Sequence, residues 1–332
     1  MISILLPVYN NSLHLGECLD SILAQSEASW ELIAVNDHST DDSWQILQRY
    51  ALRDARIRPR HNTGPKGIIP ALRIALKYSR GSYITRMDAD DLMPADKLKI
   101  LKRLLQEHGP SWVATGKVRY FSDGELGDGY RRYERWLNSL MDSGRHYDEI
   151  YRECILPSPS WMAYRETLLI CGAFERDVYP EDYDLAFRFY KHRIRIAASK
   201  EVLHLWRDHS GRASRNSSTY ADYTFLNLKL KYFLEIEYRP SRPLVVWGAG
   251  RKGKEAAQYL QEEGIHFHWI CNTPSKWGKD IYGINMRSPE ALAELDSPQV
   301  IVLVAAPEAQ PLIRAQLENQ GLTVGRDYFF FC

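Results

Sequence analysis

The sequence predicts an α/β protein built on a mainly parallel, doubly wound sheet. Two observations predict this fold class. Short apolar runs of strand length alternate with segments whose apolar residues recur at helical spacing. A second alternation of the same kind begins after the break at 239–243, Arg-Pro-Ser-Arg-Pro. Such alternation is typical of βαβ units and parallel strands.

The elements of the first part follow in order. Strands are predicted at 2–8, 30–35, 83–87 and 112–121, with helical patterns around 15–23, 46–47, 71–76 and 98–105. Gly109-Pro110 ends the last of these helices. The middle, 122–215, is less regular and is predicted to contain a helix at 181–192 and a strand near 202–206.

The second part begins with a long predicted helix at 219–238, which the prolines at 240 and 243 terminate. Strands are then predicted at 244–247, 267–271, 300–305 and 329–331, and helices after Gly253 and at 311–320. We therefore predict a first domain at 1–215, a linker helix at 216–241 and a smaller α/β domain at 242–332. A buried dimer contact is the alternative for the apolar 329–331 run.

Composition excludes several classes of protein. The 332 residues fit two domains, and a net charge of +1 provides no overall attraction to nucleic acid. The five cysteines form no CxxC pair and no zinc-ligand spacing, which favours a reducing compartment. The opening apolar run lacks a basic segment before it, and we find no apolar run near 18 residues. We expect a cytoplasmic protein, with peripheral membrane attachment left open.

The most informative segment is Asp88-Ala-Asp90-Asp91, which follows a predicted strand and precedes a helix. Ligands in open α/β sheets collect just past the carboxyl ends of strands. Two carboxylates one residue apart could hold Mg²⁺ or Mn²⁺ together with a diphosphate, because these cations prefer oxygen ligands. An acidic loop that caps the next helix is the alternative, and the segment by itself slightly favours it.

For three further polar segments, a binding or catalytic role and a purely structural role are both open. Asp37 ends a predicted strand and could accept hydrogen bonds from a nucleobase or ribose, or help cap the next helix. Glu181 and Asp182 open a helix, where a carboxylate could act as general base or stabilise the helix dipole. The run 204–214 offers imidazole, guanidinium and hydroxyl groups that suit a diphosphate or a metal. A solvated basic loop is its alternative, especially for Arg212 and Arg215.

Taken in this order, the segments resemble family 2 glycosyltransferases of the GT-A fold. The matching pieces are PVYN at 7–10, VND at 35–37, NTG at 62–64, DADD at 88–91, CGAF at 171–174, EDYDL at 181–185 and WRDHSGRAS at 206–214. The resemblance covers 1–215. It implies a GT-A sheet flanked by helices and an inverting transfer of a sugar from a nucleotide-diphosphate sugar to an acceptor hydroxyl. Bacterial surface polysaccharide or glycan biosynthesis is the implied setting.

The resemblance also implies roles for single residues. The nucleotide-binding residues would be Pro7, Tyr9, Asp37, Asp88, Arg207 and His209. Asp88, Asp90 and His209 would bind Mn²⁺ or Mg²⁺, with Asp90 the direct ligand. Asp182 would be the catalytic base, with Glu181 as second candidate. The segments 65–67 and 70–73 depart from the helix start that is usual in the family.

The acceptor side is predicted from aromatic and basic residues. Trp161 follows Pro157-Ser-Pro-Ser160 and could stack on a sugar of a glycan or lipid-linked glycan, or be a core residue. Arginines 131, 132 and 135 lie beside aromatic residues and could meet a lipid-linked phosphate at the inner face of a membrane. A solvated helix face explains the arginines more simply.

The second domain contains Gly248-x-Gly250-x-x-Gly253 between a strand and a helix, the setting of a dinucleotide fingerprint. The acid expected at the end of the next strand is replaced by Cys271 and Asn272. We therefore expect a Rossmann-like accessory domain for assembly or partner contact, with glycines that serve close packing. An NAD(P)-dependent sugar-modifying enzyme is the alternative function. A scaffold without catalysis is a third, which the intact DADD and EDYD segments oppose.

Overall fold

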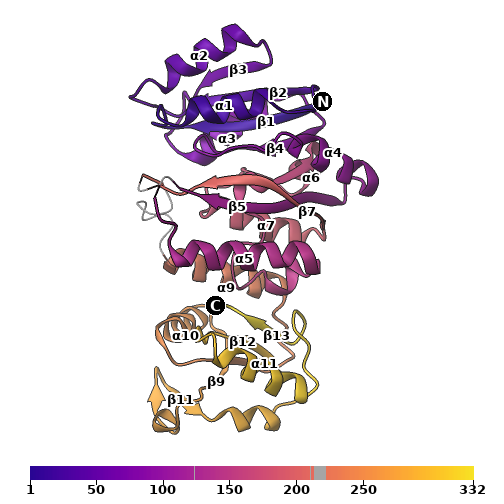
Figure 1. Cartoon of the computed structure of the whole chain (residues 1–332). Helices are drawn as coiled ribbons and strands as arrows, with labels where there is room; N and C mark the ends of the chain where they lie inside the picture. Colours follow the sequence, from indigo (N-terminus) through magenta and orange to yellow (C-terminus); the bar gives the residue numbers. More distant parts are fainter. Residues whose placement is uncertain (123, 210, 213–221) are drawn as a thin grey trace. The chain divides into compact units, whose positions relative to one another are not determined.

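The structure is a computed structural model that describes residues 1–122, 124–209, 211–212 and 222–332, with the backbone alone at 222–224 (Figure 1). It divides into two compact units. The first unit comprises Met1–His146 and Ile155–Ser217, and the second comprises Tyr147–Cys154 and Ser218–Cys332. The division differs from the expected domains, because the second unit includes the helix expected as a linker and a short segment from the middle of the first part.

The first unit contains a seven-stranded sheet in the order β3-β2-β1-β4-β6-β5-β7. Its strands are β1 Ile2–Val8, β2 Trp30–Asn36, β3 Ile57–His61, β4 Tyr83–Arg86, β5 Trp112–Phe121, β6 Trp161–Tyr164 and β7 Arg195–Arg207. All neighbours are parallel except β6, which runs antiparallel to both β4 and β5. The mainly parallel sheet is thus confirmed.

Helices accompany these strands along the chain. They are α1 Leu15–Leu23, α2 Ser43–Arg53, α3 Ile68–Tyr78, α4 Lys97–His108, α5 Asp128–Ser143, α6 Arg165–Ile170 and α7 Glu181–Lys191, with 3₁₀ turns at His146–Glu149 and Ser158–Ser160. The apolar residues of α1 at 15, 18, 19 and 22 are all buried, as a helix with one core-facing stripe requires. Every residue of β2 is buried, as expected for a parallel strand covered on both faces.

Short or atypical elements were missed from the sequence. The edge strand β3 buries only Ile57, so its sequence shows no apolar run. Strand β6 has four residues and lies in a stretch rich in proline and serine, where neither length nor periodicity indicates a strand. Helix α5 was expected only as a solvated helix face at Arg131, Arg132 and Arg135, and these arginines are exposed on it. It buries only Leu137, Leu140 and Met141 of its sixteen residues, too few to show a clear apolar stripe.

The second unit contains a six-stranded sheet in the order β10-β11-β9-β8-β12-β13. The strands are β8 Leu244–Trp247, β9 His268–Ile270, β10 Asp280–Ile281, β11 Ile284–Arg287, β12 Gln299–Val302 and β13 Tyr328–Phe330. The helices are α9 Asp222–Ile236, α10 Arg251–Glu262 and α11 Ala309–Asn319, with 3₁₀ turns at Pro274–Lys276 and Pro289–Glu294. Only β10 and β11 pair antiparallel. The first residues of the predicted helix 219–238 lie outside the described residues.

The segment Tyr147–Cys154 belongs to the second unit because its side chains join that unit's core. The ring of Tyr151 stacks on Phe331 with centroids 5.2 Å apart and meets Phe329 edge-on at 5.4 Å. The Lys229 Nζ atom donates to the Arg152 carbonyl at 2.8 Å. Phe329–Phe331 are buried inside this unit, so the last-strand interpretation of the apolar ending is confirmed.

Among the described residues, none of the helices combines the length and the apolar character that crossing a lipid bilayer requires.

The three glycines at the turn from β8 into the first turn of α10 serve close packing at two of their positions. A Cβ atom on Gly253 would lie 2.1 Å from the Gly248 carbonyl oxygen, and one on Gly248 would lie 3.0 Å from the Leu303 backbone. A Cβ atom on Gly250 would meet nothing within 4 Å. Two carbonyls of the turn also accept side-chain bonds, Gly248 from Trp269 at 2.7 Å and Ala249 from Lys276 at 2.9 Å.

We expect Gly253→Ala to destabilise the second unit by about 1–3 kcal/mol, because the added methyl forces α10 away from β8. Gly250→Ala is the matched control, since its φ of −81° suits any residue, and we expect a change below about 1 kcal/mol. Amide hydrogen exchange of β8 and β12 measures each loss locally, because two units need not unfold together. Equal effects of the two substitutions would contradict the packing role.

Candidate active site

The acidic segments meet at the carboxyl ends of neighbouring strands. Strands β2, β1 and β4 are adjacent and parallel, so the residues that follow β2 and β4 emerge at one edge of the sheet. The Asp37 amide donates to the Val8 carbonyl at 2.7 Å, and the Met87 amide donates to Leu5 at 3.0 Å. Leu92 exchanges two 3.0 Å backbone hydrogen bonds with Leu205, which joins the Asp88–Asp91 loop to β7.

Asp90 and His209 form a half-buried pair at this edge. The His209 Nε2 atom lies 2.9 Å from Asp90 Oδ2, and the two side chains are 27% and 20% exposed. The ring of His14 lies 5.0 Å from that of His209. Burial lowers the pKa of His14, and the nearby Arg207 guanidinium lowers it further. A carboxylate and an imidazole that are both reachable from solvent offer ligands to a divalent cation.

The three predicted metal ligands do not form one cluster. In the part of the chain that the structure describes, no group of three or more His, Cys, Asp or Glu side chains is arranged to hold a metal ion. Asp88 faces Arg86, whose Nε atom donates to it at 3.0 Å. The pair Asp90 and His209 nevertheless fits Mn²⁺ or Mg²⁺ in a site completed by substrate phosphates and water, since Mg²⁺ is commonly held by one or two protein ligands.

Arg86 connects the Asp88–Asp91 loop to the start of α7. Its guanidinium donates to Asp88 on one side and, at 2.9 Å, to Glu181 on the other. The side chains of Arg86 and Glu181 are each 4% exposed, so this ion pair is buried. Burial raises the pKa of Asp88, although Arg86 opposes the rise.

Asp182 lies beside this ion pair and is suited to proton transfer. Burial, and then the charge of Glu181, raise the pKa of Asp182 to about 7, although Arg86 opposes the rise. The Tyr183 amide donates to its Oδ1 atom at 2.8 Å. A carboxylate that titrates near neutral pH can accept a proton efficiently. Glu181 is held by Arg86 instead, which favours Asp182 of the two predicted bases.

Asp91 is buried and joins the Asp88–Asp91 loop to β7. Its carboxylate accepts from the Arg207 amide at 2.8 Å and lies 2.9 Å from His204 Nε2. Burial raises the pKa of Asp91 well above its usual range and lowers that of His204 well below. Lys97 Nζ lies 3.3 Å from the other ring nitrogen of His204. Burial lowers the pKa of Lys97 to about 8.

The sequence analysis missed Lys97, although a signal was present. Lys97 stands four residues before Leu101 and eight before Leu105, on the buried stripe of α4. A lysine at a core position of a helical pattern indicates a partnered, buried ammonium.

Asp37 organises the loop that borders a cavity. Asn62 donates to one carboxylate oxygen of Asp37 at 2.6 Å, and the Gly67 amide donates to the other at 2.9 Å. Asn62 also donates to the Pro65 carbonyl at 2.7 Å. These bonds fix the loop 62–67 around the buried Asp37 side chain.

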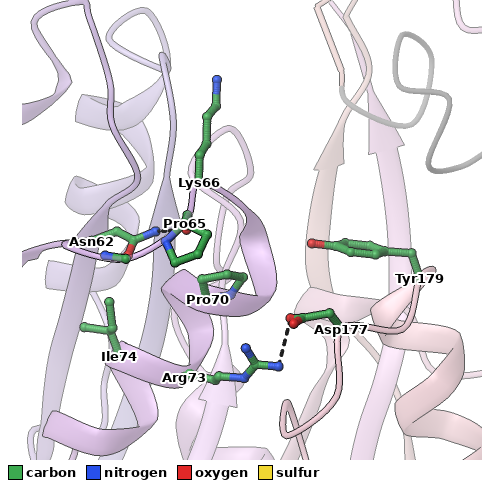
Figure 2. Close-up of a pocket in the computed structure, with 9 residues that line it drawn as sticks. Asn62, Pro65, Lys66, Pro70, Arg73, Ile74, Asp177 and Tyr179 are labelled. Carbon is green, nitrogen blue, oxygen red and sulfur yellow. Dashed lines mark hydrogen bonds and ion pairs between the residues drawn. The ribbon is translucent and has the colours of Figure 1, made fainter.

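The cavity beside this loop has a volume of about 350 Å³. Figure 2 shows Asn62, Pro65, Pro70 and Arg73 on one side of it, with Asp177 and Tyr179 facing them from the segment before α7. Arg73 and Asp177 form an ion pair of 2.8 Å. The ammonium of Lys66 lies 3.6 Å from the ring centroid of the exposed Tyr9. The volume is that of a small-molecule pocket.

Arg207 is buried, and its guanidinium contacts other residues of the protein. The predicted nucleotide-binding guanidinium is only 4% exposed. It donates to the Asp90 carbonyl at 2.8 Å, pairs with Glu17 and lies 4.6 Å from the centre of the Phe121 ring. These contacts make Arg207 a support of the Asp88–Asp91 loop. Pro7, predicted for the same pocket, is half-buried at the end of β1.

Two expectations from the sequence need correction. Trp161 is 1% exposed and packs edge-on against Phe189 at 6.3 Å, so its ring cannot stack on an acceptor sugar. Arg212 is not a solvated loop residue, because it is 9% exposed and its guanidinium lies 5.1 Å from the Trp206 ring and 5.8 Å from that of Tyr120. Ser210, Ser214 and Arg215 lie outside the described residues.

The sheet order and the acidic loop at its edge are those of the GT-A fold. Residues 3–172 match the model of Glycosyl transferase family 2, which is about half of the chain. The chain therefore belongs to glycosyltransferase family 2. The glycosyltransferase GlyG of Streptococcus pneumoniae is 27% identical over 65% of this chain and 73% of its own length. EpsE of Bacillus subtilis is 31% identical over 66% of this chain and 77% of its own length.

Solved structures share the fold at lower identity. S. aureus TarS superimposes with a TM-score of 0.54 over 79% of this chain, at 18% identity. The chain spans 43% of the length of TarS. A mannosyltransferase from Pyrobaculum calidifontis, solved with GDP-Man and Mn²⁺, gives a TM-score of 0.53 over 70% of this chain and 63% of its own, at 21% identity.

We expect Arg86→Met to destabilise the first unit by about 3–5 kcal/mol, because it leaves the buried Glu181 carboxylate without its cation. The double variant Arg86→Met with Glu181→Met should lose clearly less than the sum of the two single variants, as measured by denaturant unfolding. Arg103→Met is the control, since the Arg103–Glu107 pair is more than half exposed and should change stability by under about 1 kcal/mol. Additive losses would contradict the buried pairing.

Proposed function

We propose that this family 2 enzyme transfers a sugar from a nucleoside-diphosphate sugar to an acceptor hydroxyl, with inversion and with the help of Mn²⁺ or Mg²⁺. One observation carries the proposal. A carboxylate with a pKa of about 7, Asp182, lies beside the buried ion pair that reaches Asp88 on the Asp88–Asp91 loop. A proton acceptor and a set of phosphate-side groups are the two requirements of a single displacement at a sugar carbon.

Two features of the first unit suggest a nucleotide-sugar donor: the cavity beside the loop 62–67, and the pair Asp90 and His209. The loop 62–67, fixed around Asp37, borders a cavity of about 350 Å³ that suits a nucleoside. Asp90 and His209 would hold a divalent cation against the diphosphate. Structures of TarS with UDP and with UDP-GlcNAc, and of the mannosyltransferase with GDP-Man, support this donor class.

In the proposed reaction Asp182 accepts the proton of the acceptor hydroxyl as its oxygen bonds to the sugar carbon. The bond from that carbon to the diphosphate oxygen breaks in the same displacement, which inverts the sugar centre. A bound divalent cation would neutralise charge on the departing diphosphate. Arg86 holds Glu181 and Asp88 in place on either side, and no covalent nucleophile is needed.

We further propose a glycan or lipid-linked glycan as acceptor, in polysaccharide assembly, with the second unit as a Rossmann-like accessory domain. The strand order in which β8 is central and the chain winds outward in both directions supports this domain type. In the glycine turn of that unit, backbone atoms pack closely against Gly248 and Gly253. Asn272, at the place of the missing acid, accepts from Trp247 at 2.6 Å. These contacts disfavour the NAD(P)-dependent alternative.

Calorimetric titration of UDP, GDP and dTDP, each with and without Mn²⁺, tests the donor. We expect one diphosphate to bind in the presence of Mn²⁺, and Asp90→Asn to weaken that binding by about 10–100-fold because a cation ligand is lost. Asp128→Asn, which removes an exposed carboxylate from α5, should bind like the wild type. NAD titrated in parallel should give no binding. Binding of NAD without any diphosphate would overturn the proposed function.

The pH dependence of transfer tests the base. Because Asp182 must be ionised to accept a proton, kcat/KM should rise with pH up to about 7 and then level off. Asp182→Asn should lower kcat by about 10²–10⁴-fold with donor binding retained. Glu181→Gln removes the charge that raises the Asp182 pKa, so its profile should move to lower pH. A profile that does not move would assign the titration to another group.

A further inference from the structure

Lys97 is a fully buried lysine of the first unit. It is the first residue of α4, and its side chain is entirely buried. Lysine is almost never fully buried unless it is partnered, because removing an ammonium from water is costly. Lys97 Nζ donates to the Pro159 carbonyl at 2.5 Å and lies 3.3 Å from His204 Nδ1.

One arm of this contact reaches the Asp88–Asp91 loop. An ammonium can only donate, so His204 Nδ1 accepts and its Nε2–H must donate to Asp91 at 2.9 Å. The other oxygen of Asp91 accepts from the Arg207 amide at 2.8 Å, and Arg207 in turn donates to the Asp90 carbonyl. The direction of every bond in this arm is thereby fixed.

The other arm reaches the 3₁₀ turn Ser158–Ser160. The Ser160 amide donates back to Pro157 at 3.0 Å, and Thr115 donates to the Ser160 carbonyl at 3.1 Å. The turn is buried and leads directly into β6, which pairs with β4. A turn with these supports moves little by itself, so its carbonyl is a firm anchor for Lys97.

We propose that Lys97 and His204 are positioning residues that hold the Asp88–Asp91 loop and the turn Ser158–Ser160 in one fixed arrangement. The inference rests on the proposed function in so far as Asp90 serves the diphosphate side. The Lys97 ammonium contacts the turn directly at Pro159 and reaches the loop through His204 and Asp91. Pro159 and His204 lie 62 and 107 residues from Lys97 in the sequence. Loss of this one ammonium then loosens both segments, whereas loss of His204 loosens only the loop.

Amide hydrogen exchange of the full chain tests the shared anchor without any ligand. In Lys97→Met, exchange at 89–92 and at 158–161 should both rise by at least about tenfold, while β2 stays unchanged. His204→Gln should raise exchange at 89–92 alone, because the contact of Lys97 with Pro159 remains. Lys99→Met is the matched control, since Lys99 is exposed on the same helix. A rise at one segment only in Lys97→Met, or a uniform rise over the unit, would overturn the proposal.

Binding separates this inference from the proposed function. Affinity for the nucleoside diphosphate that binds the wild type with Mn²⁺ should fall about tenfold in Lys97→Met and stay the same in Lys99→Met. Unchanged affinity in Lys97→Met would reject a positioning role for the donor side. If the wild type binds none of UDP, GDP and dTDP, the proposed function fails, and the exchange pattern still decides the shared anchor. Should Lys97→Met not fold, hydrogen exchange of His204→Gln decides the shared anchor. A rise at 89–92 alone supports it, and a rise at both segments or at neither rejects it.

Discussion

The burial of several carboxylates close together at one edge of the seven-stranded sheet is the constraint on which the rest of the first unit depends. Parallel strands bring their carboxyl ends together, so the acids that follow them must share a small volume. Each acid has its own compensation. Arg86 lies between Asp88 and Glu181, His209 lies against Asp90, and a histidine and a backbone amide serve Asp91. Asp182 accepts from the Tyr183 amide, and its pKa rises to about 7.

The residues at this edge of the sheet fall into two groups, one partly exposed to solvent and one buried. Asp90 and His209 keep part of their surface exposed and can meet a ligand. Arg86 and Lys97 are buried, and they hold the loop without reaching solvent. A buried cation fixes its partners more firmly than an exposed one, because losing the bond would leave charge in a medium of low polarity. Precise placement of the exposed groups therefore depends on residues that no ligand touches.

The second unit uses the same α/β principles without the acids. Its strand ends carry glycine, alanine and Asn272 where the first unit carries carboxylates. Two carbonyls of its glycine turn accept hydrogen bonds from within the unit, from Trp269 and Lys276. A fold of parallel strands does not by itself specify a site, since the side chains at the strand ends decide the chemistry. The two units illustrate this within one chain.

Local sequence patterns were enough to predict the two α/β units, the long buried strands and the acidic segments that follow them. Apolar periodicity is a local property, so β2 and α4 could be predicted from neighbouring residues alone. The three-dimensional packing was needed to show that Trp161 is a core residue and that Asp88 faces Arg86. It also decided that Lys97 joins two distant segments. Burial and charge pairing depend on residues far apart in the chain, and no local pattern records which of them meet.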